Sequence, residues 1–294
     1  MSSPRRARST PSGADQLSAL PEDVIHHVLS LLPAHEAVRT CVLARRWRHL
    51  WTSAPSIRVT GVKGWPDADR FLCFVDRLLT LHRGGSTVLS WEFHLDETDF
   101  DPFFNICNVT GKCHTSRLME RILECNVGTL RLCLNNMAPM IGIALLPDLI
   151  LVSQHLTMLE LHGVITNGRV LDFSGCPMLV KMKMESSCID VKEFSSASLK
   201  QLIMVDCQFC KEKRTRFSLP SLVSLELNLY TGRAPLLGSM SSLETATVSL
   251  NSQCADSCEC EDDYCDGSGC YKDSDNDDKS CVLLKAYFFT IAIA

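Results

Sequence analysis

The first sixty residues place apolar side chains at helical spacing. In LSALPEDVIHHVLSLLP, residues 17–33, Pro21 occupies a good first helical position. Two acidic residues follow it in the first turn, where they suit the positive end of the helix dipole. Pro33 ends the predicted helix. Its wide apolar face comprises Val24, Ile25, Val28, Leu29, Leu31 and Leu32.

Two shorter helices are predicted to follow, in AHEAVRTCVLA and in RRWRHLW, and Pro55 closes the second of them. Their predicted inward side chains are Val38, Cys41, Val42 and Leu43, and then Trp47, Leu50 and Trp51. Three helices this short bury a core too small to be secure alone. We therefore expect a partner or a neighbouring domain to cover this unit.

After residue 60 the pattern changes to alternating strands with the form L-x-x-L-x-L. The copies start at Val127, Leu156, Leu179, Leu199, Leu222 and Leu243, with an earlier candidate at Val88. Subtracting successive starts from Val127 onward gives spacings of 29, 23, 20, 23 and 21 residues. These spacings are typical of leucine-rich repeats. The predicted fold is α/β: three short helices, then a solenoid whose parallel strands expose Glu160, Lys183 and Glu226 on a concave face.

Each repeat should bend where an Asn or Cys side chain bonds the backbone. Asn135, Cys207 and Asn251 fit this position, whereas Val164, Ser187 and Tyr230 do not. The short segments between strands predict loops and short helices on the convex side. The segment 66–83 differs and predicts a bridging helix, with Asp67 as a cap candidate and an apolar set of Phe71, Val75, Leu78, Leu79 and Leu81.

The chain therefore divides into six predicted segments. They are a disordered basic arm at 1–14, the three-helix unit at 15–55, a linker with the bridging helix at 56–86, repeats at 87–253, an acidic cysteine-rich insertion at 254–280, expected to be disordered, and an apolar tail at 281–294. The tail is interpreted either as a final edge strand or as a truncated repeat.

Charge is unevenly spread over the 294 residues, whose formal net charge is −5. Residues 1–60 carry eight basic and four acidic residues, whereas residues 254–279 carry two basic and ten acidic ones. The protein as a whole is therefore not expected to bind polyanions. The first residues lack the apolar core of a signal peptide, and the longest apolar run is too short to span a bilayer. We expect a soluble protein in the cytoplasm, the nucleus or both, without membrane contact.

The sixteen cysteines are then expected to be thiols or metal ligands. Five lie between Cys254 and Cys270, but without paired C-x-x-C spacing or histidine, which favours a solvated acidic segment over a zinc site. The calcium-loop-like run at Asp273, the pair Cys207 and Cys210, and the segment 107–114 are weaker candidates still. Phosphate-binding, zinc-protease and nucleophile-elbow motifs are absent from the sequence, so no catalytic residue, metal or cofactor is expected.

Residues 15–51, DQLSALPEDVIHHVLSLLPAHEAVRTCVLARRWRHLW, closely resemble the F-box of plant F-box/leucine-rich-repeat proteins. The residues that carry the resemblance are Leu17, Leu20, Pro21, Asp23, Ile25, Leu29, Leu32, Pro33, the run AVRTCVLARRW, Leu50 and Trp51. The repeats, with the phrases GCPML and SLPSLVSLEL, resemble the recognition domain of that family.

The resemblance implies a non-catalytic substrate receptor of an SCF-type cullin ubiquitin ligase. The F-box would dock on a Skp-family adaptor, and through it on a cullin, while the repeats hold an unknown substrate protein for ubiquitination. The implied adaptor contacts, or their immediate support, are Leu20, Pro21, Ile25, Leu29, Leu32, Val38, Leu43, Trp47 and Leu50.

Two other hypotheses stay open at the level of sequence. The apolar end CVLLKAYFFTIAIA is compatible with a truncated form that binds the adaptor but no substrate. The arginines of PRRAR with Arg45, Arg46 and Arg48 are compatible with a nucleic-acid binder, although the acidic tract and the small excess of basic residues argue against it. The favoured interpretation has neither nucleic acid nor membrane as a partner.

Overall fold

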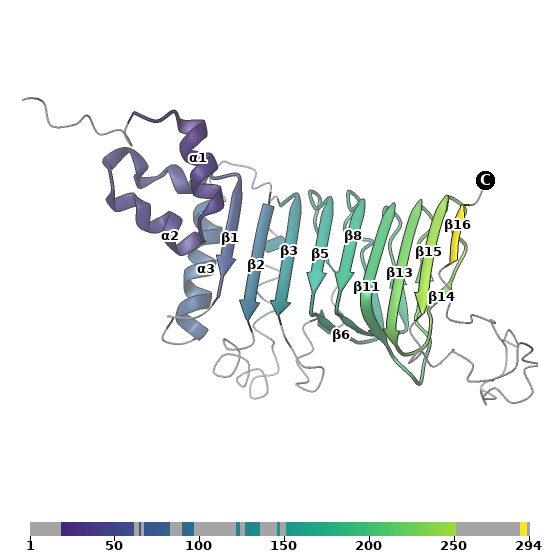
Figure 1. Cartoon of the computed structure of the whole chain (residues 1–294). Helices are drawn as coiled ribbons and strands as arrows, with labels where there is room; N and C mark the ends of the chain where they lie inside the picture. The colour runs from purple at the N-terminus through teal and green to yellow at the C-terminus, as the bar shows by residue number, and fades with distance from the viewer. Residues whose placement is uncertain are drawn as a thin grey trace, which may run out of the picture.

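The protein has a mixed α/β fold in which a helical N-terminal unit adjoins one end of a long parallel sheet (Figure 1). The structure, a computed structural model, describes residues 19–61, 65, 68–82, 90–96, 122–123, 127–135, 146–147, 151–250 and 289–292. The predicted basic arm at 1–14, the insertion at 254–280, the run at Asp273 and the segment 107–114 lie outside these residues.

The helical unit contains two α-helices and three short 3₁₀ turns. Helix α1 spans Glu22–Leu31 and α2 spans Ala34–Arg39, and the 3₁₀ turns span Thr40–Val42, Arg45–Arg48 and Leu50–Ser53. The predicted second helix is therefore shorter, and the predicted third helix is wrong. Ala44 is extended (φ −154°, ψ 153°) and His49 leaves helical geometry (φ −123°, ψ −4°), so no helix continues through either residue.

The main sheet adds its strands in chain order. Its parallel neighbours are β1 (Ser56–Thr60), β2 (Ser90–Asp96), β3 (Thr129–Asn135), β5 (Met158–His162), β8 (Lys181–Glu185), β11 (Gln201–Phe209), β13 (Ser224–Thr231) and β15 (Thr245–Leu250). All seven predicted strands are confirmed, each starting two residues after the first residue of its motif. Strand β1 lies inside the segment predicted as a linker and was not predicted.

The apolar tail contributes a strand at the far end of this sheet. Strand β16 (Phe289–Ala292) pairs antiparallel with β15, with Val248 opposite Phe289 and Thr245 opposite Ala292. The prediction that the tail pairs as an edge strand is confirmed.

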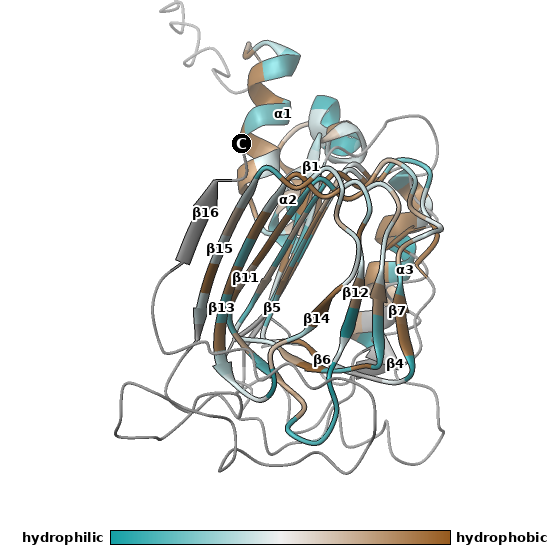
Figure 2. Ribbon diagram, turned by 90° about the vertical axis from the view of Figure 1, so that its right-hand side faces the viewer, coloured by the Kyte–Doolittle hydropathy of each residue, from teal (hydrophilic) through white to brown (hydrophobic). Residues whose placement is uncertain are grey.

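A second layer of short strands covers one side of the main sheet (Figure 2). Four of them form a separate parallel sheet, β7 (Val170–Asp172), β10 (Glu193–Ser195), β12 (Arg216–Ser218) and β14 (Leu236–Leu237). Three more, β4 (Leu146–Pro147), β6 (Ile165–Asn167) and β9 (Cys188–Asp190), pair alongside the main sheet. The predicted loops and short helices are wrong for these residues, because strands of two or three residues are too short to show a period in the sequence.

Three phenylalanines stack within the core of the two layers. Phe173, Phe194 and Phe217 are buried, and the ring centre of Phe194 lies 5.4 Å from that of Phe173 and 5.2 Å from that of Phe217. Phe194 is also the register partner of Phe217 across β10 and β12. On the other side the register partner of Phe194 is Leu171, and Phe173, just after β7, extends the row of aromatic rings.

Side chains near the ends of the strands satisfy backbone groups, as predicted for Cys207, which lies at an irregularity within β11. Its buried Sγ lies 3.6 Å from the carbonyl oxygen of Met184, and burial raises the pKa of its thiol to about 12, so it stays a protonated donor. The prediction that Ser187 does not fit is wrong. Its Oγ accepts from the N–H of Val164 (3.2 Å) and donates to the carbonyl of Glu185 (2.9 Å). The side chain of Asn135, and Asn251, lie outside the described residues.

Helix α3 (Ala68–His82) confirms the predicted bridging helix. Its buried residues Phe71, Val75, Leu78 and Leu79 belong to the same cluster as the core of the main sheet, whereas Leu81, the remaining member of the predicted apolar set, is 48% exposed. In the part of the chain that the structure describes, no helix has the length and apolar character of a membrane span.

The junction between the helical unit and the sheet centres on His82. Its ring lies 5.4 Å from the ring of Trp51, and its Nδ1 and Nε2 lie 3.0 Å and 3.1 Å from the carbonyl oxygens of Leu78 and Trp51. A neutral imidazole has one N–H and donates to only one of these carbonyls at a time. Pro33 additionally forms a parallel bridge with Arg58 of β1. The helical unit is thus held directly against α3 and the first strand.

Acid is expected to weaken the fold through His82. Burial lowers the pKa of His82, although the carbonyls of Leu78 and Trp51 raise it in part. Between this lowered folded pKa and the unfolded value of about 6.5, the unfolded chain binds a proton that the folded chain does not. The free energy of unfolding therefore falls as pH decreases through this window, by up to about 1.4 kcal/mol per pH unit for one proton. Urea unfolding at several pH values measures this slope.

The contribution of His82 to this pH dependence is measured by comparing how steeply the free energy of unfolding changes with pH in each variant, rather than by comparing absolute stabilities. His82→Gln should show a shallower dependence on pH than the wild type, and His27→Gln, at an exposed position of α1, should keep the wild-type slope. Equal slopes for the wild type and His82→Gln would contradict this prediction.

Candidate functional site

Among the described residues, nothing covers one of the two faces of the main sheet, and we call this face the open face. It is the side opposite the short strands of the second layer (Figure 2). Strand residues alternate between the buried core and this face, so β8 buries Met182 and Met184 while Lys181, Lys183 and Glu185 stay half-buried. The predicted outward positions Glu160, Lys183 and Glu226 all lie on this face.

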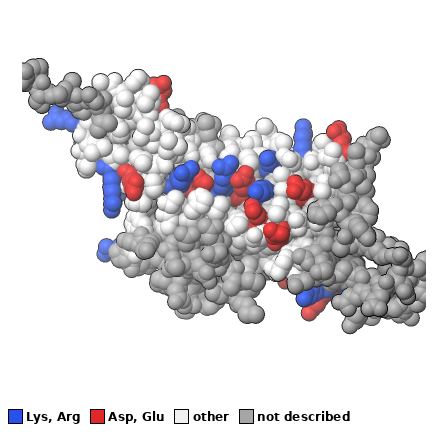
Figure 3. Space-filling model, in the orientation of Figure 1, with Lys and Arg blue, Asp and Glu red and all other residues white. Residues whose placement is uncertain are grey.

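Charged residues alternate in sign across the open face. The register of β1, β2, β3, β5 and β8 places one row side by side: Arg58, Glu92, Arg131, Glu160 and Lys183. Figure 3 shows the alternation as a band of blue and red across the molecule. We call this row the charge ladder. Adjacent strands lie about 4.8 Å apart, so each charge has an opposite charge within side-chain reach.

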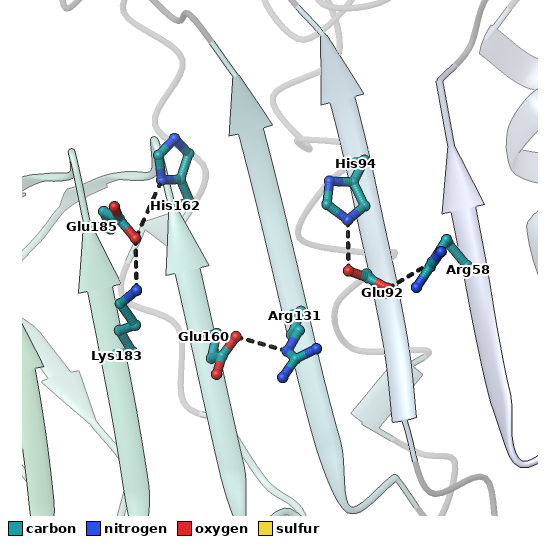
Figure 4. A network of polar contacts seen from close by, with 8 residues as sticks. All are labelled: Arg58, Glu92, His94, Arg131, Glu160, His162, Lys183 and Glu185. Atoms are coloured by element: carbon teal, nitrogen blue, oxygen red, sulfur yellow. Dashed lines mark hydrogen bonds and ion pairs between the residues drawn. The ribbon is translucent and has the colours of Figure 1, made fainter. Parts of the chain in front are cut away.

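The charged side chains of the ladder form ion pairs with other residues of the protein (Figure 4). Arg58 Nε donates to Glu92 Oε2 (2.8 Å), and Arg131 Nε pairs with Glu160 Oε2 (2.7 Å). Lys183 Nζ instead pairs with Glu185 Oε2 of its own strand (2.8 Å). Pairs of this kind contribute little to stability where they are exposed, so their main effect is to balance the charge of this half of the face.

Two histidines extend the ladder toward the ends of the strands. His94 Nε2 lies 2.7 Å from Glu92 Oε1, and His162 Nδ1 lies 3.9 Å from Glu185 Oε2. Partial burial raises the pKa of Glu92, but hydrogen bonds from His94 and Arg58 outweigh it and leave the pKa lowered. The hydrogen bond from Lys183 lowers the pKa of Glu185. Both carboxyl groups therefore stay ionised at neutral pH.

The helical unit encloses a small core of its own. Ile25, Leu29, Ala37, Trp47 and Ala54 are buried together. Arg46 joins the second 3₁₀ turn to the start of α1, since its Nη1 donates to the carbonyl of Leu20 (2.8 Å). One of the six arginines that the nucleic-acid hypothesis uses thus also serves the internal structure of the unit.

Several large apolar side chains of this unit remain exposed. On α1 these are Val24 (40% exposed), Val28 (37%) and Leu31 (55%), and after α2 they are Val42 (82%) and Leu43 (58%). Val24, Val28 and Leu31 are spaced i, i+4 and i+7, so they lie on one face of the helix. We call these five the exposed apolar residues. Their number on so small a unit indicates a surface that a partner covers.

This sequence unit matches a known family. Residues 17–58 match the F-box domain. The chain carries an F-box. Its F-box extends from just before α1 into β1, which is consistent with the direct contact between this unit and the sheet.

The similarity to plant F-box proteins continues beyond the F-box. The F-box/LRR-repeat protein At4g14103 of Arabidopsis thaliana is 28% identical over 69% of this chain and 55% of its own length. The F-box/LRR-repeat protein At3g59200 of the same plant is 29% identical over 72% of this chain and 45% of its own length. The predicted resemblance to plant F-box/leucine-rich-repeat proteins is confirmed. The chain spans about half the length of these two relatives, and no solved structure matches it significantly.

The nine predicted adaptor residues fall into three groups within the F-box. Ile25, Leu29 and Trp47 are core residues; Leu20, Leu32, Val38 and Leu50 are half-buried; Pro21 and Leu43 are exposed. The first group is positioned to support an adaptor surface rather than to touch it directly. Which of the nine contact an adaptor stays a prediction.

Two inward assignments in the F-box are wrong. Val42 and Leu43 were predicted to face the core, but they follow the end of α2 and point outward, because a 3₁₀ turn replaces the predicted helix there. Val24, Val28, Leu31 and Val42 were missed as surface residues. The available signal was the width of the predicted apolar face of the first helix. It has six apolar positions, which is more than so small a core can bury.

The remaining candidate sites have limited support. Within the described ranges, no three histidine, cysteine or acidic residues lie close enough to hold a metal ion. Cys207 donates to the carbonyl of Met184 from within β11, at an irregularity of the strand, and Cys210 is half-buried just after the strand. On the first helix, His26 is half-buried and His27 is exposed.

Proposed function

We propose that this F-box protein is the substrate-recognition subunit of an SCF-type cullin ubiquitin ligase. Its F-box docks on a Skp-family adaptor, and its strands form a leucine-rich-repeat solenoid that holds a target protein for ubiquitination. The observation that carries the proposal is the set of exposed apolar residues on the F-box, at the end of the molecule farthest from β15. Burying apolar surface contributes roughly 25 cal/mol per Å², which makes such a surface a natural docking site.

The parallel order of the strands supports the solenoid part of the proposal. From β3 to β15 the strands of the main sheet start 20 to 29 residues apart and pair side by side, which is what stacked leucine-rich repeats produce. The open face then offers one continuous surface for a target. The chain itself performs no chemistry in this proposal. It raises the effective concentration of the target near the ubiquitin donor. The proposed location is the cytoplasm, the nucleus or both.

The test is direct binding between the purified chain and a Skp-family adaptor, measured by calorimetry. Leu43→Asp and Val42→Asp should each weaken adaptor binding about 30-fold or more, because a charge replaces an exposed apolar contact worth roughly 2 kcal/mol at an interface. Neither change should affect the thermal midpoint, since both side chains are exposed.

The matched control is Val180→Asp, which places the same charge at a 42% exposed valine just before β8. It should bind the adaptor as the wild type does. If the wild-type chain does not bind the adaptor, or if Val180→Asp weakens binding as much as Leu43→Asp, the proposed function is wrong.

A further inference from the structure

The charge ladder stops at β8. The next residues in the same row are Ile203 on β11, Glu226 on β13 and Thr247 on β15. The row thus changes from alternating charges to one carboxylate between an aliphatic and a hydroxyl side chain. The nearest basic residue of the row, Lys183, is two strands away and already paired with Glu185. Among the described residues, no side chain forms an ion pair with Glu226.

A charge of opposite sign is left over at the same boundary. Lys181 of β8 lies between Met158 and Gln201 in the neighbouring row, and it forms no ion pair with another residue that the structure describes. Lys181 and Glu226 are separated by two strand spacings and two residues along the strand, about 12 Å between Cα atoms. Among the described residues, neither Lys181 nor Glu226 thus has a direct ion pair, although Glu226 lies near enough to Lys183 to attract it.

An aliphatic side chain lies between these two charges. Ile203 alternates with the buried Leu202 and Met204 along β11 and is half-buried on the open face. It is the register partner of Glu226, and Gln201, the partner of Lys181, lies two residues before it on the same strand. The open face thus presents an aliphatic side chain between Lys181 and Glu226.

We propose that Lys181, Ile203 and Glu226 recognise an extended segment of the target protein with the pattern acid-x-aliphatic-x-base. In an extended chain, side chains i, i+2 and i+4 lie on one side, and i to i+4 spans roughly 13 Å, close to the separation of the two charges. The acid meets Lys181, the aliphatic residue covers Ile203, and the base meets Glu226. This inference rests on the proposed function, because it names the target chemistry of the open face.

The absence of ion pairs explains why the site at Lys181 and Glu226, and not the charge ladder, selects the target. A partner charge placed over Arg131 and Glu160 competes with a pair that already exists, so it gains little. Covering Glu226 without a base leaves a desolvated, unpaired carboxylate, which disfavours partners that lack one. The same reasoning applies with opposite sign to Lys181.

The test is selection of a phage-displayed library of random 12-residue peptides on the full chain bound to its adaptor. The wild type should enrich peptides with the pattern acid-x-aliphatic-x-base. Glu226→Lys should lose the preference for a base and enrich peptides with acids at both ends. A peptide selected on the wild type should bind Glu226→Lys about 10- to 100-fold more weakly and the nearly isosteric Glu226→Gln more weakly than the wild type.

Glu212→Lys is the matched control, because it reverses an exposed charge in the turn after β11 and should keep the wild-type selection. Selection of no peptide, or of peptides whose charge pattern is the same for wild type and Glu226→Lys, overturns the inference. A wild-type dimer that Glu226→Lys dissociates also overturns it, because a second copy would then occupy this point.

Adaptor binding is measured on the same preparations, so the two proposals fail separately. Intact adaptor binding with charge-insensitive selection contradicts only the target pattern. Absent adaptor binding contradicts the proposed function, and the selection is then repeated on the chain alone, where the same charge dependence is required.

Discussion

Phe194→Ala is expected to lower the free energy of unfolding by about 3–5 kcal/mol, the range for truncating a large buried aromatic side chain. Phe194 is fully buried and its ring lies between those of Phe173 and Phe217. Its loss removes apolar burial, interrupts the aromatic row and leaves a cavity that neighbouring strands cannot easily fill. Urea unfolding followed by circular dichroism measures the change.

Tyr230→Ala is the control for this prediction. Tyr230 lies on β13 but is 42% exposed, so the same truncation should cost less than about 1 kcal/mol. A small change for Phe194→Ala, similar to that for Tyr230→Ala, would mean that the two layers do not share the tightly packed core described above.

Gly232→Ala is expected to be comparably disruptive, with a loss of about 2–6 kcal/mol from backbone strain and steric overlap together. Gly232 follows β13 with a φ of 96°, and a Cβ added there would overlap the carbonyl oxygen of Phe209 at the end of β11. The overlap is with backbone, so no side-chain rotation relieves it. The midpoint and slope of urea unfolding report the loss.

Gly163→Ala separates the contribution of backbone strain from that of steric overlap. Gly163 also has a positive φ (69°), so its substitution reports the cost of this backbone conformation for alanine. Gly232→Ala should be the more destabilising of the two. Equal effects would contradict the close approach of Gly232 to Phe209.

The strands were predictable because their period is strong and repeated. Motifs starting at Leu156, Leu179, Leu199 and Leu222 alternate buried and outward residues so regularly that both the strands and the outward Glu160, Lys183 and Glu226 follow from the sequence. The bridging helix was predictable for the same reason. Regular alternation over one element is a local property, and the sequence contains it.

Features that depend on neighbouring elements were not predictable. The charge ladder requires the register between β1 and β2, and β1 is too short to stand out within 56–86. Ser187 bonds the backbone at a bend where Asn or Cys was expected, because a hydroxyl supplies both a donor and an acceptor. Val42 and Leu43 are exposed because α2 ends at Arg39. The helical pattern of apolar residues continues beyond Arg39, so the sequence does not reveal this end.

The junction at His82 and Trp51 has a consequence for how a bound target would be presented. Strand β1 starts at Ser56, directly after the last F-box turn ends at Ser53, so no flexible tether separates the docking end from the open face. A ligand on a flexible tether samples a volume, whereas one on a rigid arm is presented in a single orientation. For the proposed receptor, the choice of which target lysines reach the ubiquitin donor would then follow from the orientation of the target on the open face, and not from the reactivity of each lysine.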